Sequence, residues 1–516
     1  MKRFFKSLLT VLLCSSFSIS TTLAVAPYIS IRSQGQNGAL EMSDWSFHRI
    51  DDEESGDLSI SAEYSQSFRS KDITQALFGC YSSDNCTTLS IKGSAIADRT
   101  ENDVVADWFY LPSNYLGTVA FKPQVQNVVT ALNVAFLSNE LAPGFYISLK
   151  APVAWTRWNL NSVFFTQDEG TISTPAGIYL NDAEKFFCSQ STDFYTTFTA
   201  ARLSCARFGC HDCDTTGARS TTRLTDIQTN IGYNFSFSNN DYSLGLFARL
   251  VIPTGNRPQG EWLFEPIAGN GHHWELGGGI NGSARFWHNT DDTKQAGFYV
   301  DGTLTHLFAT RQNRVFDLIG KPLSRYMTAA HFVDGIVTEH APLANLTSCA
   351  MKVSVGVQAD IVMLFNYTSH NWSYDCGYNL WTRSCETFHC SSDNCADCCG
   401  KCIIQKGSEE WGISTIGSTE TMSLSTIVEK AAADVTPMFI TDNDIDYNGA
   451  RTKGITNKLF VHVAYSWLNH TAIPYIGLGG DVELGSKVNC CLLEKSCCKN
   501  LALSQWSVWL KGGVSF

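Results

Sequence analysis

The last eleven residues, Trp506-Ser507-Val508-Trp509-Leu510-Lys511-Gly512-Gly513-Val514-Ser515-Phe516, decide the fold class. Their even positions carry Trp, Val, Leu, Gly, Val and Phe, whereas their odd positions carry Ser, Trp, Lys, Gly and Ser. Successive side chains of a β-strand point to opposite faces. The segment therefore predicts a strand with one apolar face and one largely polar face.

The same alternation recurs along the chain. From Met351 to Phe365 the odd positions are mostly apolar, over a length well beyond the roughly five residues of a typical globular strand. Such a length suits a tilted strand that crosses a membrane. Twelve segments alternate in this way: 58–64, 126–137, 145–155, 231–237, 242–252, 274–288, 298–308, 351–365, 372–380, 459–467, 476–484 and 506–516. The stretch 385–457 has room for two or four more strands.

The connections between these segments alternate in length. If Phe516 lies on the periplasmic side, the inside connections are all short: 138–144, 238–241, 289–295, 366–371 and 468–475. The outside connections are all long: 65–125, 159–226, 253–272, 309–350, 382–458 and 485–504. This asymmetry is typical of outer-membrane barrels. We predict an all-β fold, a transmembrane antiparallel β-barrel of 12–16 strands with short periplasmic turns and long cystine-rich external loops. The alternative is a secreted, disulfide-rich β-sandwich.

The N-terminus predicts export. Lys2, Arg3 and Lys6 precede a short apolar run, and Ala24 ends a small-x-small cleavage site. We expect a signal peptide at residues 1–24, an N-terminal periplasmic segment at 25–56, and a single barrel domain at 57–516, located in the bacterial outer membrane. The formal net charge of −12 argues against a nucleic-acid partner, because phosphate binding needs clustered Lys and Arg.

The terminal strand also carries a family resemblance. An alternating strand that closes on Phe516, with Val514, Gly512 and Leu510 on the same face, resembles the assembly signal of bacterial outer-membrane β-barrels. The chain as a whole resembles porin-type barrels, and its cysteine-rich loops are similar to those of the major outer-membrane porins of chlamydia-like bacteria. The resemblance implies a water-filled passage, a possible homo-oligomer, and recognition of Phe516 by the outer-membrane assembly machinery.

Cysteines gather in the predicted outside loops. An oxidising compartment favours disulfides within each loop cluster, although Cys-x-x-Cys spacings leave a metal site as a weaker alternative. Cys349 has no mate in a cluster, so we expect a bridge to another loop or molecule. Cys376 shares an apolar face and is expected to stay unbonded. The disulfide candidates are Cys80, Cys86, Cys188, Cys205, Cys210, Cys213, Cys385, Cys390, Cys395, Cys398, Cys399, Cys402, Cys490, Cys491, Cys497 and Cys498.

Charged residues opposite the apolar faces are candidates for the pore lining. They are the basic residues Lys150, Arg249, Arg285, Lys352 and Lys511, and the acidic residues Glu63, Glu275, Asp301, Asp360, Asp375, Asp481 and Glu483. Because selectivity follows the predominant sign of charge, this set predicts a pore with a weak preference for cations.

Catalytic chemistry has little support in the sequence. His272, His273, His288 and His306 could suggest a metal or acid–base site, but the predicted topology keeps them apart. No nucleophile elbow, zinc-binding helix motif or phosphate-binding glycine loop is present. We predict no enzyme activity, cofactor or metal. The favoured function is a porin-like channel for ions and small hydrophilic solutes, embedded in outer-membrane lipid. The alternative is a structural or surface-interaction protein with cross-linked external loops.

Overall fold

The computed structural model describes residues 29, 31–43, 55–78, 87–99, 103–106, 112–138, 142–170, 218–237, 241–260, 264–319, 324–326, 328–333, 336–389, 405–406, 409–416, 420–421, 437–468, 472–485 and 499–516. The predicted signal peptide lies outside these residues.

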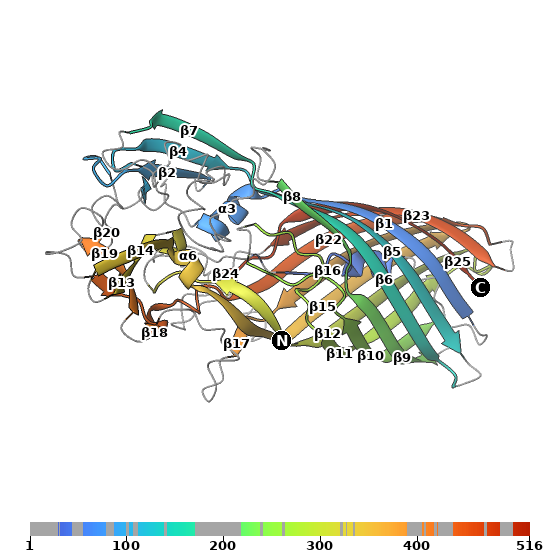
Figure 1. Ribbon diagram of the computed structural model, residues 1–516. Helices are drawn as coiled ribbons and strands as arrows, with labels where there is room; N and C mark the ends of the chain where they lie inside the picture. Colours follow the sequence, from blue (N-terminus) through green and yellow to red (C-terminus); the bar gives the residue numbers. More distant parts are fainter. Residues whose placement is uncertain are drawn as a thin grey trace, which may run out of the picture.

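Twelve long antiparallel strands form the main body of the molecule (Figure 1). They are β1 (Ser55–Ser67), β5 (Gln124–Ser138), β6 (Phe145–Asn159), β9 (Ile227–Phe237), β10 (Tyr242–Ile252), β11 (Glu275–His288), β12 (Lys294–Val315), β15 (Ser348–Ser369), β16 (Trp372–Arg383), β22 (Thr452–Ser466), β23 (Ile473–Gly485) and β25 (Gln505–Ser515). Each overlaps one of the twelve alternating segments, so the predicted strands are confirmed.

The strands close into a barrel. Their order is β12-β11-β10-β9-β6-β5-β1-β25-β23-β22-β16-β15, and β12 pairs with β15 to complete the ring. The C-terminal strand β25 lies between β1 and β23, with Leu510 opposite Ala62 on one side and Leu478 on the other. Closure leaves no free strand edge in the wall, and the predicted transmembrane β-barrel is confirmed with twelve strands.

The outer face of the wall is apolar on all twelve strands. Leu459, Leu478 and Ile60, for example, are 68%, 63% and 58% exposed. In a soluble sandwich these residues would form the core, and their exposure therefore contradicts the alternative fold. A continuous belt of this kind is the surface that a barrel presents to lipid.

Smaller elements gather at the end of the barrel away from the C-terminus (Figure 1). One sheet contains β2 (Thr88–Lys92), β3 (Val104–Val105), β4 (Leu116–Phe121) and β7 (Ser162–Asp168), and another contains β13 (Thr328–Val333), β14 (Ile336–Pro342), β18 (Gln405–Lys406), β19 (Glu409–Ile416), β20 (Glu420–Thr421) and β21 (Pro437–Phe439). Strands β8 (Ala218–Leu224), β17 (Glu386–His389) and β24 (Lys499–Asn500) border the wall. Apart from the start of β22, the strands described in 385–457 thus lie outside the ring rather than adding to it.

The described helical elements are short. They are α2 (Gly38–Met42), α3 (Ser70–Phe78), α6 (Leu343–Leu346), η3 (Ser324–Tyr326) and η4 (Asp442–Asp444). No helix in the described part of the chain is long and apolar enough to cross a membrane.

Strand β15 extends beyond the belt and changes its surroundings along its length. Met363 and Phe365 are more than 40% exposed, whereas Met351 and Val353 are fully buried in a cluster with Phe316 and Leu343. One alternating run therefore serves two environments, the lipid-facing wall and a protein core at the outer end.

Candidate functional site

The inner face of the wall is polar. On β25, Ser507, Trp509 and Lys511 are buried, while Val508 and Leu510 between them are about half exposed. The twofold repeat of a strand thus places the odd positions in the lumen and the even ones on the outside. The other barrel strands likewise direct most of their buried polar residues inward.

A segment from the N-terminal region crosses this lumen. Residues 31–43, called the plug below, end in the short helix α2, and the side chain of Asn37 accepts a hydrogen bond from the amide of Leu40 as its N-cap. Sequence analysis assigned residues 25–56 to the periplasm, whereas the described part of that range between 31 and 43 lies inside the barrel. Alternation along the wall strands holds no information on what fills the space they enclose, so the plug was missed.

An apolar patch inside the lumen holds one face of α2. Ala39, Leu40 and Met42 are buried there. They pack in a cluster with Tyr299, Val362, Leu364, Phe460 and Trp509 from the wall. Gly38 makes the closest approach, since a Cβ on this residue would lie 2.7 Å from Cγ2 of Val362. The chain therefore needs glycine at this position to bring α2 against β15.

The two charged residues of the plug each meet the opposite charge on the wall. Arg32 forms ion pairs with Glu483 at 2.6 Å and with Asp360 at 3.2 Å. Glu41 forms an ion pair with Lys150 at 2.8 Å and lies 4.0 Å from Arg249. Ion pairs with little access to water are stronger than surface pairs, and each partner depends on the other.

These contacts lie on opposite arcs of the ring. Arg32 pairs with β15 and β23, whereas Glu41 pairs with β6 and β10. The strand order separates the two arcs by β25, β1 and β5 on one side and by β11 and β12 on the other. The plug thus spans the lumen from an acidic arc to a basic arc.

Hydrogen bonds between uncharged groups of the plug and charged side chains of the wall hold the plug between its two ends. The Asn37 side chain donates to Glu63 at 2.9 Å and accepts from Lys458 at 3.0 Å. Lys511 donates to the carbonyl oxygen of Ser43 at 2.7 Å. Gln36 lies 3.4 Å from Glu275. None of residues 31–43 belongs to a strand, so the plug is held by side chains and not by sheet pairing.

The acidic arc carries its own cation. Lys458 lies directly across from Glu483 in the β22–β23 register, 3.6 Å from its carboxylate and 3.2 Å from that of Asp481. On the neighbouring pair β16–β22, His462 lies 2.9 Å from Asp375. Burial opposes ionisation of Glu41, but the Lys150 and Arg249 cations outweigh it and lower the pKa of this carboxyl below its ordinary value of 4.5.

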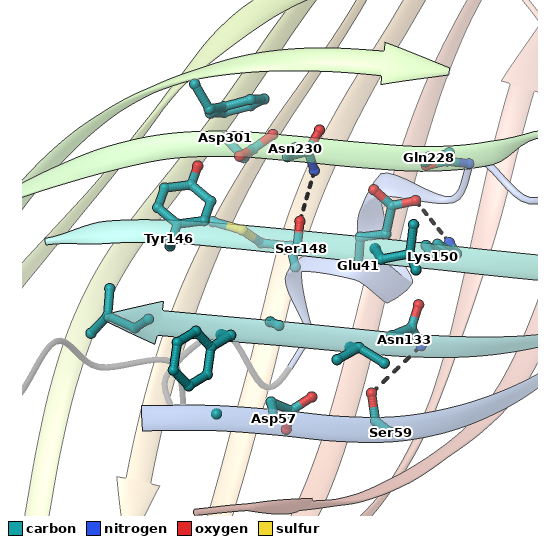
Figure 2. A pocket seen from close by; sticks show the side chains of 18 of the residues that line it. Glu41, Asp57, Ser59, Asn133, Tyr146, Ser148, Lys150, Gln228, Asn230 and Asp301 are labelled. Carbon is teal, nitrogen blue, oxygen red and sulfur yellow. Dashed lines mark hydrogen bonds and ion pairs between the residues drawn. The ribbon is translucent and has the colours of Figure 1, made fainter. Parts of the chain in front are cut away.

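Two cavities adjoin the plug. The larger, about 170 Å³, is bordered by Gly38, Leu40, Glu41 and Met42 at the C-terminal half of the plug. The smaller, about 60 Å³, is bordered by Ile31 to Gln34, Gln36 and Asn37 at its N-terminal half. Figure 2 shows the larger cavity, with Glu41 and Lys150 turned toward each other across it.

The structure places ten of the twelve pore-lining candidates on the lumen side. They contact the plug, line the larger cavity or join the buried network: Glu63, Lys150, Arg249, Glu275, Asp301, Asp360, Asp375, Asp481, Glu483 and Lys511. Lys352 was predicted wrongly, because it is exposed on the outer extension of β15. Arg285 forms an ion pair with Asp241 at 2.5 Å beside a hairpin turn and does not contact the plug.

Sequence analysis missed Lys458, Arg32 and Glu41. Lys458 stands one residue before the expected strand 459–467, and extending the alternation by that residue would have placed it beside Phe460 and His462 on the inner face. Arg32 and Glu41 lie in a stretch without periodicity. The one signal in the sequence is that they are the two charged residues of 31–43.

The histidines occupy separate environments. His273 is buried, with Nδ1 2.8 Å from the carbonyl oxygen of Phe308, and burial lowers its pKa to about 3. His306 is exposed beside Gly356, and His288 pairs with Asp292 near the opposite end. Within the described residues no group of three or more His, Cys, Asp or Glu side chains could hold a metal ion.

Few of the cysteines lie in the described ranges. Cys376 is free and exposed on the outer face, as predicted. Cys349 and Cys385 each take part in a disulfide bond. The remaining disulfide candidates lie outside the described residues, so pairing within the loop clusters stays a prediction.

Comparison with known proteins returns only distant similarity. No protein-family model and no curated protein matches the chain. An outer-membrane channel from Pseudomonas putida F1 is 9% identical, with a TM-score of 0.34, over 89% of this chain and 96% of that one. The β domain of a Bordetella autotransporter is 8% identical, with a TM-score of 0.27, over 90% and 100%. A Pseudomonas aeruginosa FadL homologue is 7% identical, with a TM-score of 0.25, over 90% of each chain. At TM-scores this low, the fold assignment depends on the strand pairing of this chain itself.

Proposed function

We propose that this protein is an outer-membrane channel for ions and small hydrophilic solutes, closed in the present state by the plug. The main support for the proposal is that a separate segment of the chain, the plug, fills the lumen. Wall side chains alone fill a barrel of about eight strands, but the ring here has twelve strands and a separate segment of chain occupies its centre. It is held by ion pairs, hydrogen bonds and one small apolar patch. Such contacts can break while the strands of the wall stay paired with one another.

The chain length also permits displacement. Twelve residue steps separate Ser43 from Ser55, the first residue of β1, and an extended chain reaches roughly 3.5 Å per residue. The connection can therefore span about 40 Å, which exceeds the roughly 25 Å height of the apolar belt of such barrels. The plug can leave the lumen while β1 stays paired in the wall.

A reversible tether tests this proposal. The Cβ built on Gly38 lies 2.7 Å from Cγ2 of Val362, close enough for a disulfide in the double variant Gly38→Cys/Val362→Cys. In planar bilayers we expect the oxidised double variant to stay silent and to open after reductant is added. A variant that lacks residues 31–43 should conduct continuously.

The single variant Val362→Cys, with and without reductant, controls for the native cysteines, because Gly38→Cys alone would bring its Cβ against Val362. A folded variant without residues 31–43 that remains silent would refute the channel. It would favour a role in which the barrel is an anchor. The two outer sheets and the buried cluster around Phe316 and Met351 would then carry the function. In either role we propose contacts with outer-membrane lipid and with the assembly machinery, which would read the strand ending at Phe516.

A further inference from the structure

We propose that Lys150 and Arg249 form a binding site for a short-chain monocarboxylate, and that Glu41 occupies this site when no ligand is present. The inference deepens the proposed function, on which it rests for its consequence, because a ligand that displaces Glu41 would loosen the plug. The site itself belongs to the wall of the larger cavity and is defined without reference to conductance.

The two cations are buried and share one anion. Lys150 and Arg249 are 9% and 6% exposed. Among the described residues, Glu41 is the one carboxylate within 4.0 Å of either. Arg249 also donates to the side-chain oxygen of Gln228 at 2.6 Å, which orients the guanidinium but does not neutralise it. If Glu41 leaves, the two desolvated cations lose their ion-pair partner and keep only a longer-range attraction between Arg249 and Asp301, which is costly.

The acidic arc, unlike the basic arc, keeps a counterion of its own when the plug leaves. When Arg32 leaves Glu483 and Asp360, Lys458 still neutralises part of the charge at Glu483 and Asp481. The basic arc holds no comparable carboxylate of its own. Asp57 and Asp301 also border the cavity, but neither forms an ion pair with Lys150 or Arg249. Release of the plug is therefore favoured on the basic side only if another anion replaces Glu41.

The cavity beside these cations indicates the rest of the ligand. Its volume of about 170 Å³ is similar to that of an apolar cavity of about 150 Å³ that accepts benzene. Leu40, Met42, Leu137 and Phe247 contribute apolar groups to its lining. A carboxylate with an apolar tail of about five carbons would place its charge at Lys150 and its tail in this space. An inorganic anion would leave the apolar surface unfilled.

Equilibrium binding of hexanoate to the full-length protein in maltoside micelles, measured by calorimetry, tests the site. We expect saturable binding to the wild type and at least tenfold tighter binding to Glu41→Gln, because the competing carboxylate is gone. In the Glu41→Gln background, Lys150→Met and Arg249→Met should each weaken binding at least tenfold. Arg285→Met serves as the matched control, since Arg285 pairs with Asp241 away from the cavity.

Three results would overturn the proposal: no binding of hexanoate to Glu41→Gln, equal binding after Lys150→Met, or equal binding of hexanol, which has the tail without the charge. Equal affinity for inorganic phosphate would leave a general anion site and contradict the monocarboxylate assignment, whereas equal affinity for acetate would contradict the apolar space assigned to the tail. Heat-dependent gel mobility shows that each variant retains its folded barrel. The assay needs no ion flow, so a silent channel with intact hexanoate binding would refute the proposed function alone.

Discussion

The side chain of Glu41 links the plug to the pH of the medium. Lys150 and Arg249 lower the pKa of this carboxyl against the effect of burial, with Arg32, Asp57, Asp301 and Lys511 as the other charges around α2 and its cavity. A plug outside the lumen returns Glu41 to its ordinary value near 4.5. A lowered pKa stabilises docking above that ordinary value, and the contribution disappears as the pH falls through the lowered pKa.

We therefore expect the open fraction of the wild-type channel to rise as the pH is lowered below about 4.5. The Glu41→Gln variant should be more open at neutral pH and should lose most of this acid response. Single-channel recordings from pH 7 to pH 3 measure both effects. Parallel pH curves for the two proteins would show that other carboxylates, such as Glu483 or Asp360, control opening.

At the scale of the strand, alternation predicts the two faces of a segment but not what each face meets. Along β15 the odd positions are apolar throughout, yet Met351 lies in a protein core and Phe365 faces outward. Lys352 lies between Met351 and Val353, which are buried in that core. Alternation alone therefore predicted Lys352 in the lumen, although this part of the strand lies beyond the lumen. The twelve strands and the barrel could be predicted from the sequence, because they depend on local periodicity, although several strands, such as β22, begin earlier than expected. The position of the plug depends on contacts such as Arg32 with Glu483, 451 residues apart, and could not.

Lys458 on β22 and Lys352 on β15 allow a comparison of the same replacement at a buried and at an exposed position. Lys458 is 3% exposed between Asp481 and Glu483, so Lys458→Met leaves the buried carboxylate of Asp481 without its ion pair, while Glu483 keeps Arg32. We expect a loss of about 3–5 kcal/mol in the free energy of unfolding, measured by urea titration in micelles. Lys352→Met makes the same replacement at an exposed position of β15 and should change stability by less than about 0.5 kcal/mol. Equal losses would show that the side-chain volume matters and the buried charge does not.

For the molecule as a whole, ion selectivity is a property of the wall, because Arg32 and Glu41 cancel each other's charge when the plug leaves. The lumen-side residues described above comprise seven carboxylates, against the cations Lys150, Arg249, Lys458 and Lys511. The carboxylates are Glu63, Glu275, Asp301, Asp360, Asp375, Asp481 and Glu483. An excess of one sign along a passage enriches the opposite ion.

A barrel that lacks residues 31–43 should therefore prefer cations, in agreement with the sequence-based expectation. The reversal potential in a tenfold KCl gradient measures the preference. Glu63→Gln should shift this potential toward zero, whereas Lys150→Gln should shift it further toward the cation limit, since each changes the wall by one charge of opposite sign. An anion-selective reversal potential would contradict the inward orientation of the acidic arc. It would leave the cations at Lys150 and Arg249, which bind the plug in the closed state, as the groups that control passage.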